Sequence, residues 1–219
     1  MSLTRILFIG NSYTYCNDLP KIVEQLSNAT GKRVQTAMVT TGGVSLEWHW
    51  CNPETLEALD GGEWDFVVLQ DYSLQAVEAP EKMRNAVASF VPRIRNAYAA
   101  PLLYLTWARQ HIPEMQDELN RTCLSMARQL DITVAPVGIA WRKTLGACPE
   151  LVLHTDDGSH PNTLGSYLAA CVFYATIFGE SPVGLTNELE STEGAGTVID
   201  EEKASFLQQM ARESIQELG

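Results

Sequence analysis

The chain of 219 residues has no cluster of lysines and arginines, and its acidic residues outnumber its basic ones, giving a formal net charge of −12. Proteins that bind nucleic acids present a basic surface to the phosphate backbone, and anionic membranes attract the same kind of surface. The charge therefore argues against nucleic acid and membrane partners. It is compatible with a small neutral substrate, although acidity alone does not indicate one.

Long apolar runs are also missing. No run reaches the about 18 residues that a membrane span needs, and the apolar segment at residues 5–10 (RILFIG) is too short for the core of a signal peptide. That segment is typical of a β-strand. We therefore expect a soluble, cytoplasmic protein, unless a leader segment has been removed from the sequence.

Paired cysteines are absent as well. The five cysteines are odd in number and none forms a CxxC pair. This pattern excludes a zinc ribbon and argues against a disulfide scaffold. We expect reduced and mostly buried thiols at Cys16, Cys51, Cys123, Cys148 and Cys171.

Short apolar runs alternate with helical patterns along the chain, which is typical of an α/β fold with a parallel sheet. The runs do not alternate with polar residues, as expected for strands that helices cover on both faces. No repeat, low-complexity block or long linker divides the chain. The sequence therefore predicts one domain over residues 1–219, with strands at residues 6–9, 34–39, 66–69, 102–106 and 133–137.

Helical patterns fill most of the intervals between these strands. Pro92 is expected to kink or interrupt one helix, whereas Leu164, Leu168 and Val172 lie close to one face of another. The polar, glycine-containing segment 186–197 is predicted to be a surface loop. The expected helices span residues 18–31, 80–99, 113–130, 162–178 and 200–218.

The loops that directly follow the strands are where chemistry is expected, because ligands of open parallel sheets bind beyond the carboxyl ends of the strands. Ser12 lies in the first of these loops, but a serine hydroxyl needs an adjacent base to become a nucleophile. A candidate base is His160, one of four histidines, three positions after Asp157 with Gly158 between them. Such a loop can fold back so that the carboxylate orients the imidazole, as in catalytic triads.

The GNS block at residues 10–12, after the first strand, and the DxxH block at residues 157–160, before a late helix, together resemble the SGNH/GDSL hydrolase superfamily. The resemblance extends over nearly the whole chain. It implies a three-layer α/β/α sandwich of flavodoxin-like type, with a five-stranded parallel sheet. It also implies a serine esterase that needs no metal or cofactor, with Ser12, Asp157 and His160 as catalytic residues.

The resemblance further implies an oxyanion hole built from the backbone of Ser12, a glycine after the second strand and an amide side chain after the third. The GGxS sequence at residues 42–45 indicates Gly43 for the second position, with Gly42 the next choice. Gln70 stands where the superfamily has asparagine. Its side chain has the same carboxamide donor but is one methylene longer, so it can act as the donor only after a small shift of the backbone. Bracing the loop and binding substrate remain open for Gln70.

Asn11 and Trp107 are the candidate substrate contacts, with Trp107 forming a wall of the pocket or part of the core. We expect a structural role for His49. The resemblance implies, as the preferred function, hydrolysis of a small ester with a short acyl group, such as acetyl on a carbohydrate, through an acyl-enzyme on Ser12.

Four other classes of protein fit the sequence less well. A metal-dependent hydrolase would use His154, Asp156, Asp157 and His160, but these residues lack HxH or HExxH spacing. A non-catalytic module that binds a small molecule or carbohydrate is favoured only by Gln70. A nucleotide-binding Rossmann protein is disfavoured because the GxGxxG and P-loop motifs are missing, and an α/β-hydrolase because GxSxG is missing. The sequence indicates neither the substrate nor the oligomeric state.

Overall fold

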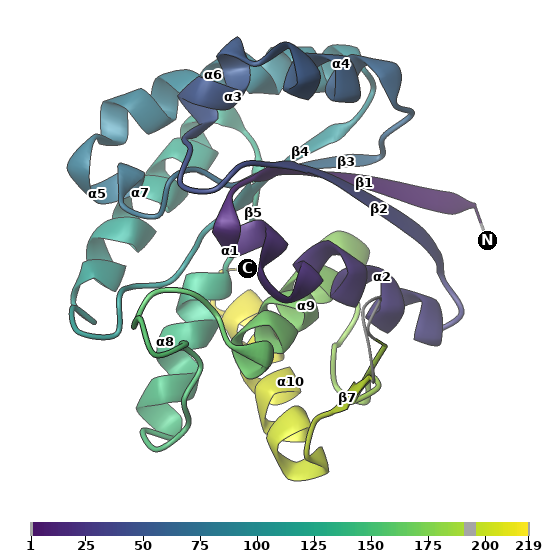
Figure 1. Cartoon of the computed structure of the whole chain (residues 1–219), viewed down its shortest axis with the longest axis vertical. Coiled ribbons are helices and arrows are strands. Elements are labelled where there is room, and N and C mark those ends of the chain that lie inside the picture. Colours follow the sequence, from purple (N-terminus) through teal and green to yellow (C-terminus); the bar gives the residue numbers. More distant parts are fainter. Residues whose placement is uncertain (1, 191–195, 219) are drawn as a thin grey trace.

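A parallel sheet of five strands forms the centre of the molecule (Figure 1). The computed structural model describes residues 2–190 and 196–218. The strand order is β2-β1-β3-β4-β5, and every neighbouring pair is parallel. This is the flavodoxin-like order, so the expected fold class is confirmed. The strands are β1 (Leu3–Gly10), β2 (Arg33–Thr40), β3 (Phe66–Leu69), β4 (Ala100–Tyr104) and β5 (Thr133–Ala135).

Helices cover both faces of this sheet (Figure 1). One layer contains α3 (Leu46–Cys51), α4 (Pro53–Gly61), α5 (Gln75–Glu78), α6 (Pro80–Asn96) and α7 (Met115–Leu130). The other contains α2 (Leu19–Ala29), α8 (Val137–Ala147), α9 (Thr163–Phe178) and α10 (Glu201–Gln216). The short helix α1 (Ser12–Tyr15) and a 3₁₀ turn (Cys16–Asp18) lie between β1 and α2.

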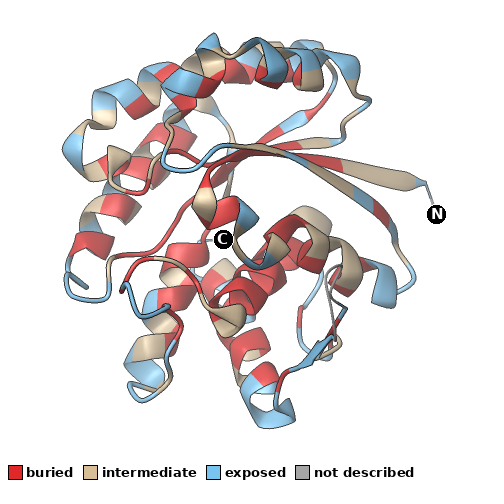
Figure 2. Cartoon of the chain, viewed as in Figure 1, coloured by how far each residue is buried: buried red, intermediate tan, exposed pale blue. Residues whose placement is uncertain are grey.

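The alternation of side chains along β1 divides the core into two apolar clusters, one on each face of the sheet. Ile6 and Phe8 belong to the cluster under α2, α8, α9 and α10, whereas Leu7 and Ile9 belong to the cluster under α3 to α7. Successive side chains of a strand point to opposite faces, so a strand with apolar residues at every position must be covered twice. Figure 2 shows buried residues on the sheet and on the inner sides of both helical layers.

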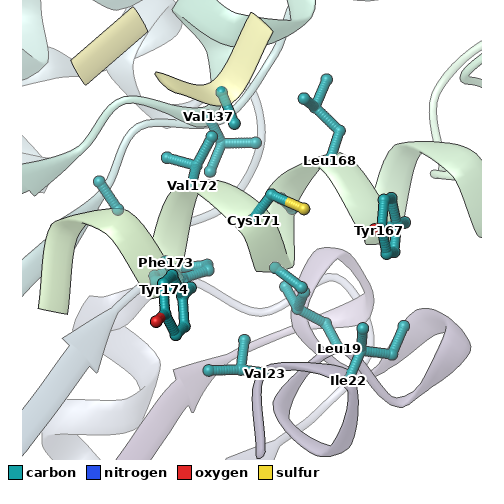
Figure 3. Close-up of a cluster of buried hydrophobic side chains, with 14 of the residues drawn as sticks. Leu19, Ile22, Val23, Val137, Tyr167, Leu168, Cys171, Val172, Phe173 and Tyr174 are labelled. Carbon is teal, nitrogen blue, oxygen red and sulfur yellow. The ribbon is translucent and has the colours of Figure 1, made fainter. Parts of the chain in front are cut away.

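Helix α9 is buried almost all round rather than on one face. Residues 165–175 are all buried, and Figure 3 shows side chains of α2 packed against it, with Leu19, Ile22 and Val23 facing its lower side. A helix that is apolar on every side belongs in the interior of a protein. The stripe through Leu164, Leu168 and Val172 is therefore only part of its buried surface.

Several boundaries differ from those expected. Helix α6 continues through Pro92 as one element. Val137 begins α8 instead of ending a strand, and α3, α4 and α8 were not predicted. Two short strands, β6 (Glu188–Leu189) inside the segment 186–197 and β7 (Thr197–Val198) at its end, pair antiparallel. Residues 191–195 of that predicted loop lie outside the described residues.

Across residues 2–190 and 196–218, no helix combines the length and the apolar character that crossing a bilayer requires.

Candidate active site

The loops that follow β1 to β4 meet at the carboxyl edge of the sheet, around a cavity of about 270 Å³. Because β1 lies between β2 and β3, the order in which successive strands are added to the sheet reverses here, and this switch point is where open α/β sheets bind ligands. Larger cavities exist elsewhere on the described surface, but this one contains the predicted nucleophile and base. Its lining residues are Asn11, Ser12, Tyr13, Tyr15, Gly42, Gly43, Tyr72, Ser73, Arg109, Ser159 and His160.

Ser12 is the first residue of α1, and Asn11 holds it there. The Asn11 side chain accepts a hydrogen bond from the Tyr13 N–H (3.2 Å), which caps the helix. Its amide nitrogen donates to the Val44 carbonyl (3.0 Å), which ties the first loop to the second. Asn11 is only 2% exposed. The structure thus gives Asn11 a positioning function, and its predicted contact with substrate stays a prediction.

His160 connects Ser12 to Asp157, although the two ends of this chain of contacts are far apart in sequence. The Ser12 Oγ lies 2.8 Å from His160 Nε2, and His160 Nδ1 is hydrogen-bonded to Asp157 Oδ2. An ionised carboxylate only accepts hydrogen bonds, so Nδ1 donates and Nε2 can accept the Ser12 proton. The structure therefore brings the three predicted residues together in the geometry of a nucleophile, a base and an orienting carboxylate.

Asp157 is held as an acceptor by its own loop. Its Oδ1 accepts from the backbone N–H of Ser159 (2.8 Å) and of His160 (2.9 Å), and from the Thr155 hydroxyl (2.8 Å). The hydrogen bond from His160, together with these backbone donors, holds the pKa of Asp157 well below its usual value. The carboxylate therefore stays ionised at neutral pH.

The loop that contains Asp157 and His160 is closed at its base by an antiparallel bridge between His154 and Pro161. Gly158 turns the loop with a φ of +67°, and an added Cβ there would lie 3.2 Å from His111 Nε2. A glycine at this position lets the backbone take the left-handed conformation without strain. The spacing of three residues between Asp157 and His160 is thus fixed by local backbone geometry.

Two glycines face Ser12 from the loop after β2. Gly43 has a φ of +71°, a conformation that favours glycine, and an added Cβ on Gly42 would lie 3.1 Å from the Tyr15 hydroxyl. Both line the cavity. Their position is compatible with an N–H donor for an oxyanion, and this role of Ser12 and Gly43 stays a prediction.

Gln70 is a correction to the predicted oxyanion hole. Its side chain is fully buried, and its Oε1 accepts from the Asn11 N–H (2.8 Å) and from the Thr14 hydroxyl (2.9 Å). Its amide nitrogen donates to the Asp71 carbonyl. Gln70 is not among the residues that line the cavity. The structure thus favours the alternative of a loop brace, since the amide is directed into the protein.

Trp107 is a second correction, because it lies behind the cavity instead of forming its wall. It is 1% exposed and stacks between Tyr13 (centroids 4.5 Å apart) and Trp141 (3.8 Å). Its indole nitrogen donates to the Ser159 carbonyl (2.9 Å), which supports the loop that contains His160. Direct contact with a substrate in this cavity is excluded by that burial.

His49 has the structural surroundings that the sequence led us to expect. It is fully buried, with Nε2 2.8 Å from the Gly10 carbonyl and Nδ1 2.8 Å from the Thr55 hydroxyl. Burial lowers its pKa, so the neutral ring bridges the end of β1 to α4.

The sequence analysis missed several residues of the cavity, of which Arg109 is the most informative. Arg109 follows β4, and its guanidinium donates to the Ser73 hydroxyl (2.9 Å) and to the Ser159 hydroxyl. The Ser159 hydroxyl is also 2.8 Å from the Tyr13 hydroxyl. A signal was present, since Arg109 lies in one of the strand-end loops where chemistry was expected.

The four residues of the metal hypothesis do not converge on one point. His154 is buried, and its Nε2 is 3.1 Å from the Ala108 carbonyl, whereas His160 faces Ser12. Within the described ranges, no three His, Cys, Asp or Glu side chains are grouped as metal ligands would be.

The fold and this edge of the sheet define a class of protein, the SGNH hydrolase fold, with Ser12 directly after β1 and with Asp157 and His160 in the loop before α9. No family model and no curated protein matches the chain. A DUF4886 family protein from Bacteroides uniformis has a TM-score of 0.76 at 20% identity, with 98% of this chain and 95% of that one covered.

A protein proposed to be an SGNH hydrolase, from Slackia heliotrinireducens, is 29% identical with a TM-score of 0.68, and the match covers 80% of this chain and 100% of that one. The acetyl xylan esterase AlAXEase is 15% identical with a TM-score of 0.65, covering 79% and 99%. The resemblance to the SGNH/GDSL superfamily is thus confirmed, and the chain has that superfamily's fold.

Proposed function

We propose that the protein is a serine esterase that removes a short acyl group from a small ester through an acyl-enzyme on Ser12. The observation that supports this most directly is the 2.8 Å contact between Ser12 Oγ and His160 Nε2, with Asp157 behind the imidazole. The contact opens onto a cavity, so a reacting carbonyl has room beside the hydroxyl.

In the first half of the reaction, the Ser12 oxygen attacks the carbonyl carbon of the ester, and the hydroxyl proton passes to His160 Nε2. The carbonyl electrons move to the oxygen, where the N–H groups of Ser12 and Gly43 stabilise the negative charge. The tetrahedral intermediate collapses as the bond to the alcohol oxygen breaks. His160 returns its proton to that oxygen, and the alcohol leaves.

In the second half, a water molecule attacks the acyl carbon while His160 takes one of its protons. The second tetrahedral intermediate collapses, the bond to Ser12 breaks, and His160 returns the proton to the Ser12 oxygen as the acid leaves. The ionised Asp157 stabilises the imidazolium in both halves. No metal or cofactor takes part in this scheme.

An acyl group as short as acetyl is the proposed substrate feature. The cavity volume of about 270 Å³ is small for a ligand site, and acetyl xylan esterase AlAXEase and the acetyl-xylooligosaccharide esterase Axe2 have similar folds. The burial of Gln70 favours one other candidate, a non-catalytic module that binds a small molecule on the same fold, because it removes the expected third oxyanion donor.

Treatment with a fluorophosphonate probe, followed by peptide mass mapping, tests the esterase proposal. We expect an adduct on Ser12 in the wild type and none in Ser12→Ala or His160→Ala, and a fall of kcat/KM for short acyl esters by about 10³-fold or more in both variants. Ser89→Ala, on α6 and remote from the cavity, is the matched serine control. An unlabelled but folded wild type would contradict the proposal and favour the binding module.

A further inference from the structure

Arg109 is a cation in the cavity without a carboxylate partner. Its guanidinium contacts two neutral hydroxyls, those of Ser73 and Ser159, and among residues 2–190 and 196–218 no Asp or Glu lies within ion-pair distance of it. The guanidinium has five N–H donors. Hydrogen bonds to two hydroxyls leave some of these donors without an acceptor, and no negative charge of the described residues is paired with the guanidinium.

Several other arginines in this acidic chain do pair with a carboxylate. Arg93 pairs with Asp60, and Arg121 pairs with Glu118, both near the surface. A partly buried charge costs free energy unless an opposite charge or several hydrogen bonds compensate it. Of the described residues that line the cavity, only Arg109 is an arginine, lysine, aspartate or glutamate.

The order of the strands places Arg109 at one end of the cavity. Gly43 follows β2, Ser12 follows β1, Ser73 follows β3 and Arg109 follows β4, which is also the order of these strands across the sheet. An ester whose carbonyl lies at Ser12, with its oxygen toward Gly43, extends its other side toward Ser73 and Arg109. The charge therefore lies where part of a substrate would be held.

We propose that Arg109 binds a carboxylate on the substrate, so that the protein acts on small esters that contain a carboxylate close to the scissile bond. This inference rests on the proposed esterase function. The planar guanidinium fits a carboxylate through two parallel hydrogen bonds. With a net charge of −12, the protein as a whole repels anions, so a local cation is needed to hold one beside Ser12.

Two matched pairs of substrates test the inference, with the charge on either side of the ester. Phenyl acetate is compared with 3-carboxyphenyl acetate, and ethyl butanoate with monoethyl succinate. For at least one pair we expect the wild type to prefer the anionic ester. Arg109→Gln should lower the ratio of kcat/KM for the anionic to the neutral ester by about 10- to 100-fold. Arg109→Lys should lower this ratio by less, because lysine keeps the positive charge but cannot form two parallel hydrogen bonds to a carboxylate.

Arg121→Gln is the control, because it removes the same charge from an exposed position on α7 and should leave the ratio unchanged. Equal losses for both members of a pair in Arg109→Gln would overturn the inference, since they indicate that Arg109 only supports the loop of Ser159. A wild type without preference for either anionic ester would overturn it too.

The fluorophosphonate probe separates this inference from the proposed function. A wild type that is labelled on Ser12 but shows no preference for anionic esters contradicts the inference and leaves the esterase function standing. If the wild type is not labelled, binding of 3-carboxyphenyl acetate is measured by calorimetry instead. Binding that is lost in Arg109→Gln then supports the carboxylate site, and absence of binding to the wild type overturns it.

Discussion

Asp71, in the loop after β3, has a buried carboxyl group whose two oxygens differ in their hydrogen bonding. Its Oδ1 accepts from the backbone N–H of Leu46 (2.9 Å) and of Tyr72 (2.7 Å), whereas its buried Oδ2 has no partner in the described part of the chain. Burial raises the pKa of Asp71 to about 6. This residue joins the second and third loops of the cavity, so its protonation affects the loops that surround Ser12.

The raised pKa predicts how Asp71 contributes to stability as the pH changes. Between the unfolded-state value of 3.8 and about 6, the native state binds more protons than the unfolded state, so the free energy of unfolding falls as pH rises. Above about pH 6 the full cost of burying the charge applies. Asp71→Asn has no such cost, and we expect it to be more stable than the wild type by about 2 kcal/mol at pH 7.5.

Urea unfolding at pH 7.5 and pH 4.0 measures this difference, which should shrink at the lower pH. Asp156→Asn makes the same chemical change at an exposed position and should not show the pH dependence. If Asp71→Asn and the wild type differ equally at both pH values, the carboxyl group is not desolvated as described.

At the scale of residues, the sequence predicted positions better than side-chain directions. Ser12, Asp157 and His160 could be located because strand ends converge on one edge and because Asp157 and His160 share a short loop. Gln70 and Trp107 lie in the correct loops, but their side chains are directed into the core. That direction depends on contacts with Asn11 and Tyr13, which lie in the segment after β1, so the residues next to Gln70 and Trp107 in sequence do not indicate it.

At the scale of elements, one glycine of α8 and one of α9 differ in their surroundings. An added Cβ at Gly165, in the first turn of α9, would lie 2.5 Å from the Trp141 ring and 2.6 Å from the Leu153 carbonyl. At Gly146, near the end of α8, it would meet no atom within 4 Å. Gly165→Ala should therefore destabilise the protein by about 1–3 kcal/mol through overpacking.

Gly146→Ala is the matched control, because the same substitution in an exposed helix is expected to stabilise by about 0.5–1 kcal/mol. Thermal and urea unfolding of both variants give the two free energies. Similar effects of the two substitutions would contradict the close packing of α9 against Trp141.

The elements that could be predicted are those with a strong local pattern. The apolar runs located all five strands of the sheet, and the helical pattern over residues 162–178 located α9. Helices α3 and α4 were missed because they are short, with 6 and 9 residues. Helix α8 was missed because Val137 continues an apolar run, while the chain in fact turns at Pro136, which is the residue before the helix.

At the scale of the whole molecule, the two apolar clusters are built on opposite faces of the same strands. If one helical layer detached, water would reach the apolar side chains of β1 and β3 on the face that it covered. The same strands also support the other cluster, which would lose its packing. We therefore expect one cooperative unfolding transition for this chain of 219 residues, with an enthalpy of about 150 kcal/mol near 60 °C.

Scanning calorimetry measures this enthalpy directly, and its agreement with the van 't Hoff enthalpy tests the prediction of a single domain. Two resolved transitions, or a van 't Hoff value far below the calorimetric one, would indicate that one helical layer melts before the other.

The stack of Tyr13, Trp107 and Trp141 has an optical consequence. Its two indole rings lie with centroids 3.8 Å apart and planes inclined by 20°, so their electronic transitions are coupled and contribute paired bands of opposite sign to the circular dichroism. Tyr13 directly follows Ser12, and Trp107 holds the carbonyl of the residue before His160. The protein thus contains an intrinsic spectroscopic signal that depends on the arrangement of both loops, without any added label.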